Sequence, residues 1–368
     1  MDANLDFLPA QEQLPLRLRL LYEKYGYMRF RMGKFEPYDI YMENRSFLKS
    51  EGIITFTNAQ GRLMALKPDV TLSIVKNTLP DSGAQKLYYN ENVFRIEHSG
   101  EEYREISQMG IEYLGSEPGY AQAEVVSLAL DSLRMIDEEY ALDVSHMGFI
   151  SGLLGAVGLD DAASEQMLAE LRRKNADGIE NLCNSLGISG AGKQSLIEAS
   201  RLRMPLRQAI EKARELALCR EMTDALNELE QLYDLLAAMG NTERVFLDFS
   251  LINDMDYYNG LVFRGYVRSA KRAVLSGGRY DNLMRRFGKE QSAVGFAVYL
   301  SELDRVLYTR PEYDVDVLLI YGDAEPVKTA AAVRALSEKG SVRAERTLPP
   351  NVRAKKIVTL GEEAAENA

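Results

Sequence analysis

The sequence predicts an α+β protein in which a mostly antiparallel sheet is flanked by helices. Residues 93–114 have the pattern of a β-hairpin whose turn lies at Ser99-Gly100. From about residue 160 to residue 240, Leu, Ala, Glu, Lys and Arg dominate, which is typical of helices. Strand patterns resume at 244–252 and 261–267. We therefore expect a sheet whose two halves are separated in the sequence by a helical insertion.

The elements before the insertion follow from local periodicity. Residues 9–25 place leucines and tyrosines at helical spacing and end at Gly26, which predicts an amphipathic helix. Between residues 27 and 114 short apolar runs alternate with Gly, Pro and Asn, and Lys67-Pro68-Asp69 is typical of a strand that leads into a helix. Residues 118–138 return to a helical period. The first half of the fold is thus mixed α and β.

After the insertion, a third strand is expected at 273–278, a turn and helix at 279–288, and a strand followed by a helix at 292–307. The tail, residues 312–368, predicts a strand at 315–321, a helix at 326–338, and two short strands near Val342 and Ile357. We expect four parts: first part of the core, helical insertion, second part of the core and a small α/β appendage, at residues 1–155, 156–240, 241–310 and 311–368.

Composition excludes several classes of protein. The net charge of −11 argues against nonspecific coating of nucleic acid, because affinity for phosphate requires clustered Lys and Arg. Two cysteines, Cys183 and Cys219, both in helix-like segments, support no disulfide framework, and the separated His98 and His146 support no metal site. No signal-peptide pattern and no apolar run of membrane-spanning length occur, so we expect a cytoplasmic protein without a membrane contact.

The predicted hairpin places polar groups on one face. Successive strand residues alternate faces, so Gln108, Gly110 and Glu112 project together, and Val93 and Arg95 share a face of the preceding strand. A carboxylate, an amide and a guanidinium on one surface require water or a zwitterionic ligand, because burying them without partners is costly. This pattern indicates a pocket for an amino acid; the alternative is a solvent-facing hairpin with alternating polar residues.

Two glycine-punctuated clusters, Asp256-Tyr257-Tyr258-Asn259-Gly260 and Ser276-Gly277-Gly278-Arg279-Tyr280-Asp281, each follow a strand pattern. Singly, either cluster could be a hairpin turn with aromatic packing. Together with the Leu66 to Thr71 element, the hairpin and the 292–305 segment, they resemble in order and spacing the catalytic core of histidyl-tRNA synthetase, which has a class II synthetase fold. The resemblance covers about residues 5–310, and that family has a helical insertion at the corresponding place.

The resemblance implies a histidine-binding pocket. In the family an acidic residue, a threonine and a glutamine, matched here by Asp69, Thr71 and Gln108, hold the α-amino group. A glutamate and a tyrosine, matched by Glu112 and Tyr258, contact the imidazole. The remaining matched positions are the neighbouring Tyr257, the nearby Tyr280, and Arg95 at the place of the motif 2 arginine. A carboxylate and a phenol can satisfy both imidazole nitrogens, which discriminates strongly against side chains that lack them.

The chain departs from the family at the positions that contact ATP. The arginine expected before Asp-Tyr-Tyr is Asn253, the glycine and arginine of motif 3 are Tyr299 and Glu302, and the motif 2 loop has Glu102 where arginine is usual. Each charge-assisted hydrogen bond contributes about 1.5 to 3 kcal/mol, so we expect adenylation to be lost. The alternative is that Arg305 or Arg264 compensates for these losses.

A core that keeps the amino-acid pocket and loses the nucleotide contacts is similar to the regulatory subunits of ATP phosphoribosyltransferase, a synthetase paralogue in histidine biosynthesis. The tail resembles a truncated anticodon-binding domain without the helix expected between Arg346 and Lys356, so tRNA binding is not expected. The resemblance implies a non-catalytic subunit without a cofactor, which forms a homodimer through its core, binds free histidine and controls a short-form catalytic subunit. The alternatives are an atypical histidyl-tRNA synthetase and a histidine-binding module with another partner.

Overall fold

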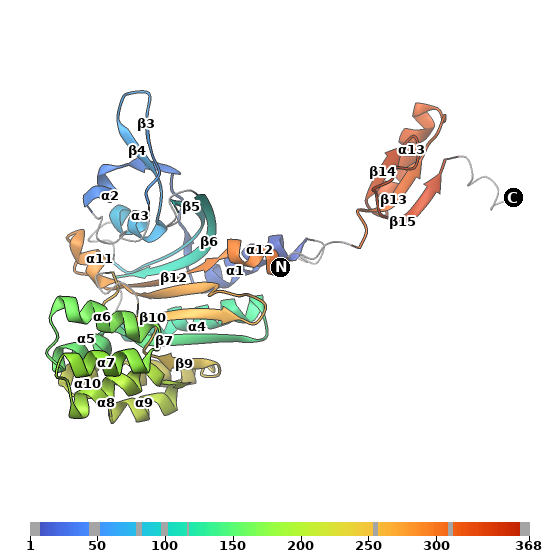
Figure 1. Ribbon diagram of the computed structural model, residues 1–368. Coiled ribbons are helices and arrows are strands. Elements are labelled where there is room, and N and C mark those ends of the chain that lie inside the picture. Colours follow the sequence, from blue (N-terminus) through green and yellow to red (C-terminus); the bar gives the residue numbers. More distant parts are fainter. Residues whose placement is uncertain are drawn as a thin grey trace. The chain divides into compact units, whose positions relative to one another are not determined.

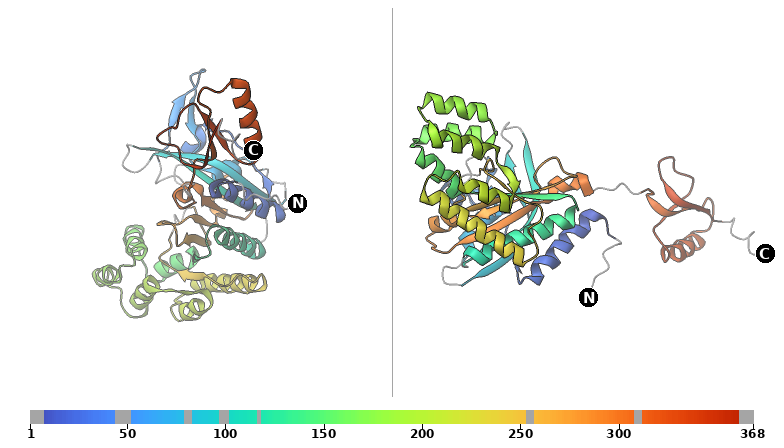
Figure 2. Two further views of the ribbon diagram at one scale, coloured as in Figure 1. Left: turned by 90° about the vertical axis from the view of Figure 1, so that its right-hand side faces the viewer. Right: turned by 90° about the horizontal axis from the view of Figure 1, so that it is seen from below.

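A computed structural model describes residues 8–43, 52–78, 83–96, 102–115, 118–252, 257–307 and 312–360 (Figures 1 and 2). The chain divides into two compact units, Met1–Leu307 and Tyr308–Ala368, and each is described by itself. The four-part division of the chain stays a prediction. The predicted turn at Ser99-Gly100 lies outside the described residues.

A nine-stranded sheet forms the centre of the first unit, in the order β1-β5-β6-β12-β11-β10-β7-β9-β8. Its strands in sequence order are β1 (Met28–Arg29), β5 (Gln85–Ile96), β6 (Tyr103–Leu114), β7 (Tyr140–His146), β8 (Arg203–Pro205), β9 (Val245–Asp248), β10 (Leu261–Val267), β11 (Leu275–Arg279) and β12 (Ala293–Tyr299). The predicted sheet is correct, but β1 pairs with β5 and β7 pairs with β9 in parallel. Parallel neighbours need a long crossover connection, and the helical insertion supplies it between β7 and β9.

The sheet has two faces: we call the one that carries Gln108 and Glu112 the first face, and the one that carries Ile111 and Phe296 the second face. The second face is covered by α1 (Ala10–Lys24) and α4 (Pro118–Ile136). The helix α1 buries Leu14, Leu18 and Tyr22 at helical spacing, so its predicted amphipathic character is confirmed. It ends before Gly26, whose φ of 83° requires a residue that tolerates the left-handed region. The larger of the two hydrophobic cores lies between these helices and the sheet and continues among the helices between β7 and β9.

The first face of the sheet, which carries Gln108 and Glu112, packs against α3 (Val70–Asn77) and α11 (Asp281–Arg286) through a smaller core. Asp69 is the N-cap of α3, since its carboxylate accepts a hydrogen bond from the Leu72 backbone N–H at 2.7 Å. This confirms the predicted transition from strand to helix. Three short strands, β2 (Phe35–Pro37), β4 (Leu63–Leu66) and β3 (Thr55–Thr57), form a separate antiparallel sheet, and α2 (Asp39–Glu43) follows β2.

The segment between β7 and β9 is helical, as predicted. Its helices are α5 (Met147–Ala156), α6 (Asp161–Arg172), α7 (Ala176–Ser185), α8 (Gly190–Arg201), α9 (Leu206–Arg214) and α10 (Arg220–Ala238). The short edge strand β8 was not predicted, because three residues in a polar stretch carry no alternation signal. Cys183 lies within α7, but Cys219 is the N-cap of α10 rather than an interior residue, and neither forms a disulfide.

The second unit contains the predicted strand, helix and two short strands. Its parallel sheet has the order β14-β13-β15, with β13 (Val315–Ile320), β14 (Val342–Glu345) and β15 (Ala354–Thr359), and α13 (Pro326–Ser337) connects β13 to β14. The described stretch between β14 and β15 contains no helix. Among the residues that the structure covers, no helix is both long and apolar enough to span a membrane.

Candidate amino-acid-binding site

Strand register brings the predicted polar residues to the first face of the sheet. The hairpin prediction is confirmed, since β5 and β6 pair antiparallel with Arg95 opposite Arg104 and Val93 opposite Ile106. On the other side of β6, Gln108 is opposite Tyr299 and Glu112 is opposite Gly295. Because paired residues of neighbouring strands point to the same face, Arg95, Gln108 and Glu112 share one surface.

Three glycines form the floor of this surface, and their missing side chains make room for functional groups. A Cβ on Gly295 would collide with the Glu112 carboxylate, and a Cβ on Gly110 would collide with the phenol of Tyr89. A Cβ on Gly278 would lie 2.6 Å from the ring of Tyr258. The glycines therefore let these side chains lie against the backbone of the sheet. Sequence reasoning missed Tyr89, and the glycines on neighbouring strands were the signal that could have found it.

The Glu112 carboxylate is the hydrogen-bonded centre of the cluster. Its Oε1 accepts a hydrogen bond from the Thr71 hydroxyl at 2.7 Å, and its Oε2 accepts one from the Tyr280 phenol at 2.5 Å. Glu112 is 1% exposed and Tyr280 is 2% exposed. Since each carboxylate oxygen can accept two hydrogen bonds, both keep capacity for a ligand N–H.

Burial raises the pKa of Glu112 to about 8, because desolvation outweighs the two hydrogen bonds that favour its charged form. Burial also raises the pKa of the neighbouring Asp69 carboxyl, although Arg95 opposes this increase. A buried carboxyl group and a second, partly buried one favour a ligand that brings positive charge or N–H donors. This matches the α-ammonium and imidazole groups that the resemblance assigns to these positions.

The remaining predicted residues lie around this carboxylate pair. Arg95 donates a hydrogen bond from Nε to the Pro68 carbonyl at 2.9 Å, and its guanidinium lies 3.9 Å from Asp69. The rings of Tyr257 and Tyr258 lie 4.6 Å apart, and the centroid of Tyr257 lies 6.0 Å from that of Tyr280. Tyr257 also interacts with the Thr71 hydroxyl. Gln108 is buried on the same face. The structure therefore brings the eight predicted residues to one region of the first face.

The positions expected to contact ATP are partly described. Asn253 lies outside the described residues, and Glu102 is exposed and directly precedes β6. Tyr299 stands on the first face beside Gln108, where the family has a glycine. Glu302 lies in the first turn of α12 (Leu300–Leu307). Of the two arginines that could compensate, Arg264 lies on the same face, on β10 (Leu261–Val267), with two strands between it and Gly110. It interacts electrostatically with Tyr258.

The sheet topology and the cluster on its first face define a protein with a class II aminoacyl-tRNA synthetase-like fold. The family model for histidyl-tRNA synthetase matches residues 2–303. The chain is 30% identical over 311 residues to the ATP phosphoribosyltransferase regulatory subunit of Thermoanaerobacter sp. (strain X514), with 81% of this chain and 80% of the relative covered. It is 30% identical over 287 residues to the regulatory subunit of Oceanobacillus iheyensis, with 77% and 70% covered.

Solved structures agree on the fold. A crystal structure described as an ATP phosphoribosyltransferase regulatory subunit/histidyl-tRNA synthetase from Bacillus halodurans matches with a TM-score of 0.79 at 24% identity, covering 95% of this chain and 93% of that one. The ATP phosphoribosyl transferase complex from Thermotoga maritima includes a chain that matches with a TM-score of 0.63 at 21% identity, covering 80% and 98%. The chain belongs to the histidyl-tRNA synthetase family and, within it, to the ATP phosphoribosyltransferase regulatory subunits.

Proposed function

We propose that this protein is a non-catalytic regulatory subunit that binds free histidine through the Glu112 cluster and controls a short-form ATP phosphoribosyltransferase catalytic subunit in the cytoplasm. The observation that carries the proposal is an asymmetry between two sets of positions that the resemblance assigns. The groups suited to an amino acid lie together, and the positions at which the synthetase contacts ATP hold Tyr299, Glu302 and Glu102. The named relatives and the Thermotoga maritima complex support the regulatory role and the catalytic-subunit partner.

In this proposal, histidine places its imidazole against Glu112 and Tyr258 and its α-ammonium near Asp69, Thr71 and Gln108. Regulation follows from linkage, because histidine shifts the complex toward the inhibited arrangement only if it binds that arrangement more tightly. A coupling free energy of about 1 to 3 kcal/mol is sufficient. We also propose that the subunit forms a homodimer through its core and does not bind tRNA.

Calorimetric titration of the purified chain with histidine and with ATP, side by side, tests the ligand assignment. We expect histidine to bind and ATP to give no heat of binding. The variant Thr71→Val removes a hydroxyl that contacts Glu112 and should weaken histidine binding about tenfold, which corresponds to one lost hydrogen bond to a charged group. The same change at the exposed Thr223 of α10 is the matched control and should leave histidine affinity unchanged.

Mixing the chain with a short-form catalytic subunit tests the partner. We expect co-elution, a gain in phosphoribosyltransferase activity, and inhibition of that activity by histidine. Histidine-dependent exchange between ATP and pyrophosphate by the chain alone would contradict the proposal and support a synthetase. Neither co-elution nor a gain in activity would instead favour a histidine-binding module with another partner.

A further inference from the structure

A hollow of about 530 Å³ opens on the second face of the sheet, away from the Glu112 cluster. It lies between the first turn of α4, the middle of α10 and the end of β11. Its lining residues are Gly119, Tyr120, Gln122, Glu228, Gln231, Leu232 and Arg279. Pockets that bind small ligands commonly have volumes of about 300 to 1,000 Å³, with a few convergent polar groups.

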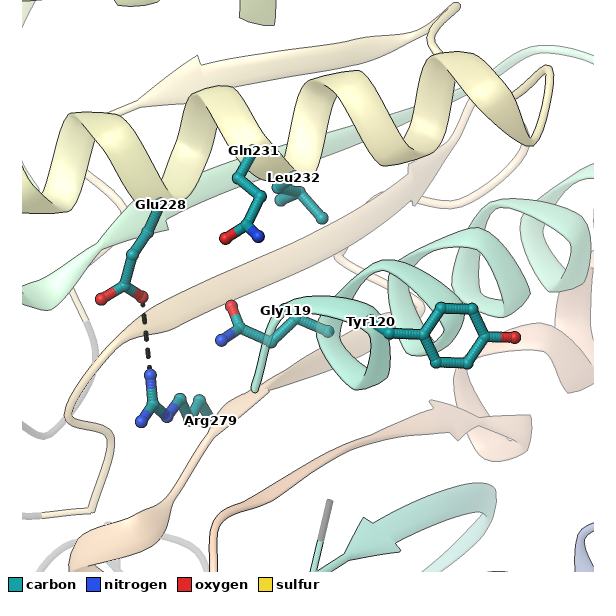
Figure 3. A pocket seen from close by; sticks show the side chains of 7 residues that line it. Gly119, Tyr120, Glu228, Gln231, Leu232 and Arg279 are labelled. Atoms are coloured by element: carbon teal, nitrogen blue, oxygen red, sulfur yellow. Dashed lines mark hydrogen bonds and ion pairs between the residues drawn. The ribbon is translucent and has the colours of Figure 1, made fainter. Parts of the chain in front are cut away.

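The guanidinium of Arg279 and the carboxylate of Glu228 face one another in this hollow (Figure 3). Each keeps atoms that can form further hydrogen bonds. Arg279 donates from Nε to Asp281 at 2.7 Å, and its Nη1 lies 3.5 Å from Oε2 of Glu228. The same Oε2 accepts from His146 Nε2, which carries the proton because Nδ1 of that ring accepts from the Gly148 N–H. In the described part of the chain, Nη2 of Arg279 and Oε1 of Glu228 form no hydrogen bond.

Gln122 supplies a second, independent observation. Its side chain is 7% exposed and lines the hollow, and its amide has no hydrogen-bond partner among the residues that the structure covers. The amide atoms of Gln122 keep contact with solvent, so they are available to bond a ligand or water in the hollow. Gln231, on α10, adds a second amide to the lining.

From these groups we infer a second ligand site on the second face, which takes a free α-amino acid with a polar side chain. The ligand's carboxylate pairs with Nη2 of Arg279 and its ammonium group pairs with Oε1 of Glu228, which are the free atoms of a weakly coupled pair. Gln122 and Gln231 then face a side chain that both donates and accepts hydrogen bonds, such as an amide. A polyanion such as a nucleotide is disfavoured, because Glu228 and Asp281 both lie against the single guanidinium. The inference does not depend on the histidine site.

L-Glutamine is the probe, measured by calorimetry and by the shift in melting temperature of the full chain. We expect L-glutamine to bind and to raise the melting temperature. N-acetyl-L-glutamine lacks the ammonium group and L-leucine lacks the polar side chain, so both should bind at least about tenfold more weakly. Absence of L-glutamine binding up to about 10 mM, a concentration that detects millimolar affinity, overturns the inference.

The variant Gln122→Met separates a ligand group from a structural one. It keeps the length of the side chain and removes an amide that bonds nothing in the protein, so the ligand-free variant should melt at the same or a higher temperature. Its affinity for L-glutamine should fall about tenfold or more. A lower melting temperature with unchanged L-glutamine affinity would mean that the amide serves the fold, which contradicts the inference.

Two further variants complete the test. Glu228→Gln keeps the size of the side chain and removes the partner of the ammonium group, so it should weaken L-glutamine binding by a similar factor. Gln194→Met, on the exposed surface of α8, is the matched control for the Gln122 change. It should alter neither the melting temperature nor the affinity for L-glutamine. None of these variants touches the Glu112 cluster, so histidine binding should persist in all of them and the two sites can be judged separately.

Discussion

Replacing Glu112 by glutamine should change how the stability of the protein depends on pH. In the folded chain the carboxyl has a pKa of about 8 against an ordinary value of 4.5. The folded state therefore binds more protons than the unfolded state between these values, and stability falls as the pH rises from 4.5 to 8. At about 1.36 kcal/mol per pH unit, the gap corresponds to a loss of about 5 kcal/mol in the free energy of unfolding.

The glutamine of Glu112→Gln cannot ionise, so this variant does not show the decrease in unfolding free energy with rising pH. Its amide group also leaves either Thr71 or Tyr280 without an acceptor, which adds a pH-independent cost of about 1 to 3 kcal/mol. The informative quantity is thus the difference in unfolding free energy between variant and natural chain, which should move in favour of the variant by about 4 kcal/mol between pH 5 and pH 9. Urea unfolding followed by far-UV circular dichroism measures it.

Glu180→Gln is the matched control for this pH series. The hydrogen bond from Lys193 lowers the pKa of Glu180, so its contribution to stability is lost only as the pH falls below the ordinary range of a carboxyl. The difference in unfolding free energy between this variant and the natural chain should stay constant from pH 5 to pH 9. If the Glu112→Gln profile also runs parallel to that of the natural chain, the dry environment assigned to Glu112 is refuted.

Three other outcomes are expected. Asp69→Ala removes the N-cap of α3 and should lower the free energy of unfolding by about 1 kcal/mol. Asp69→Ser keeps a capping oxygen and should restore most of that stability. Calorimetry should find histidine binding weakened in both variants, because both lack the carboxylate. Gly295→Ala collides with Glu112 and should destabilise the chain by about 1 to 3 kcal/mol in urea unfolding, whereas Gly155→Ala, a helical position with open space, should stabilise it by about 0.5 to 1 kcal/mol. A chain ending at residue 307 should fold and bind histidine with unchanged affinity by calorimetry, because the Glu112 cluster lies entirely within the first compact unit.

Local pattern was sufficient to predict most elements of this fold. The amphipathic period of α1, the alternation of β6 and the strand-to-helix transition at Lys67-Pro68-Asp69 each depend on residues close together in the sequence, so their signals are present there. The parallel pairing of β7 with β9 joins strands separated by the whole helical insertion. Nothing local in either strand encodes that choice.

The same distinction applies to the site. Its residues could be predicted because a family resemblance supplied their identities. The hydrogen bonds between them could not be predicted. Thr71 and Glu112 are 41 positions apart, and Glu112 and Tyr280 are 168 positions apart. The hollow on the second face was missed altogether, since its walls come from three distant segments and none of them carries a recognisable motif.

The glycine floor beneath the Glu112 cluster limits how this binding site can evolve. Where a pocket base is built from leucine or valine, shortening one side chain deepens the cavity by a methyl group at a time. Gly110, Gly278 and Gly295 have no atoms left to remove, and additions there meet occupied space. A descendant that accommodates a bulkier ligand must therefore change the helices and tyrosines above the sheet, while its base stays fixed by the main chain.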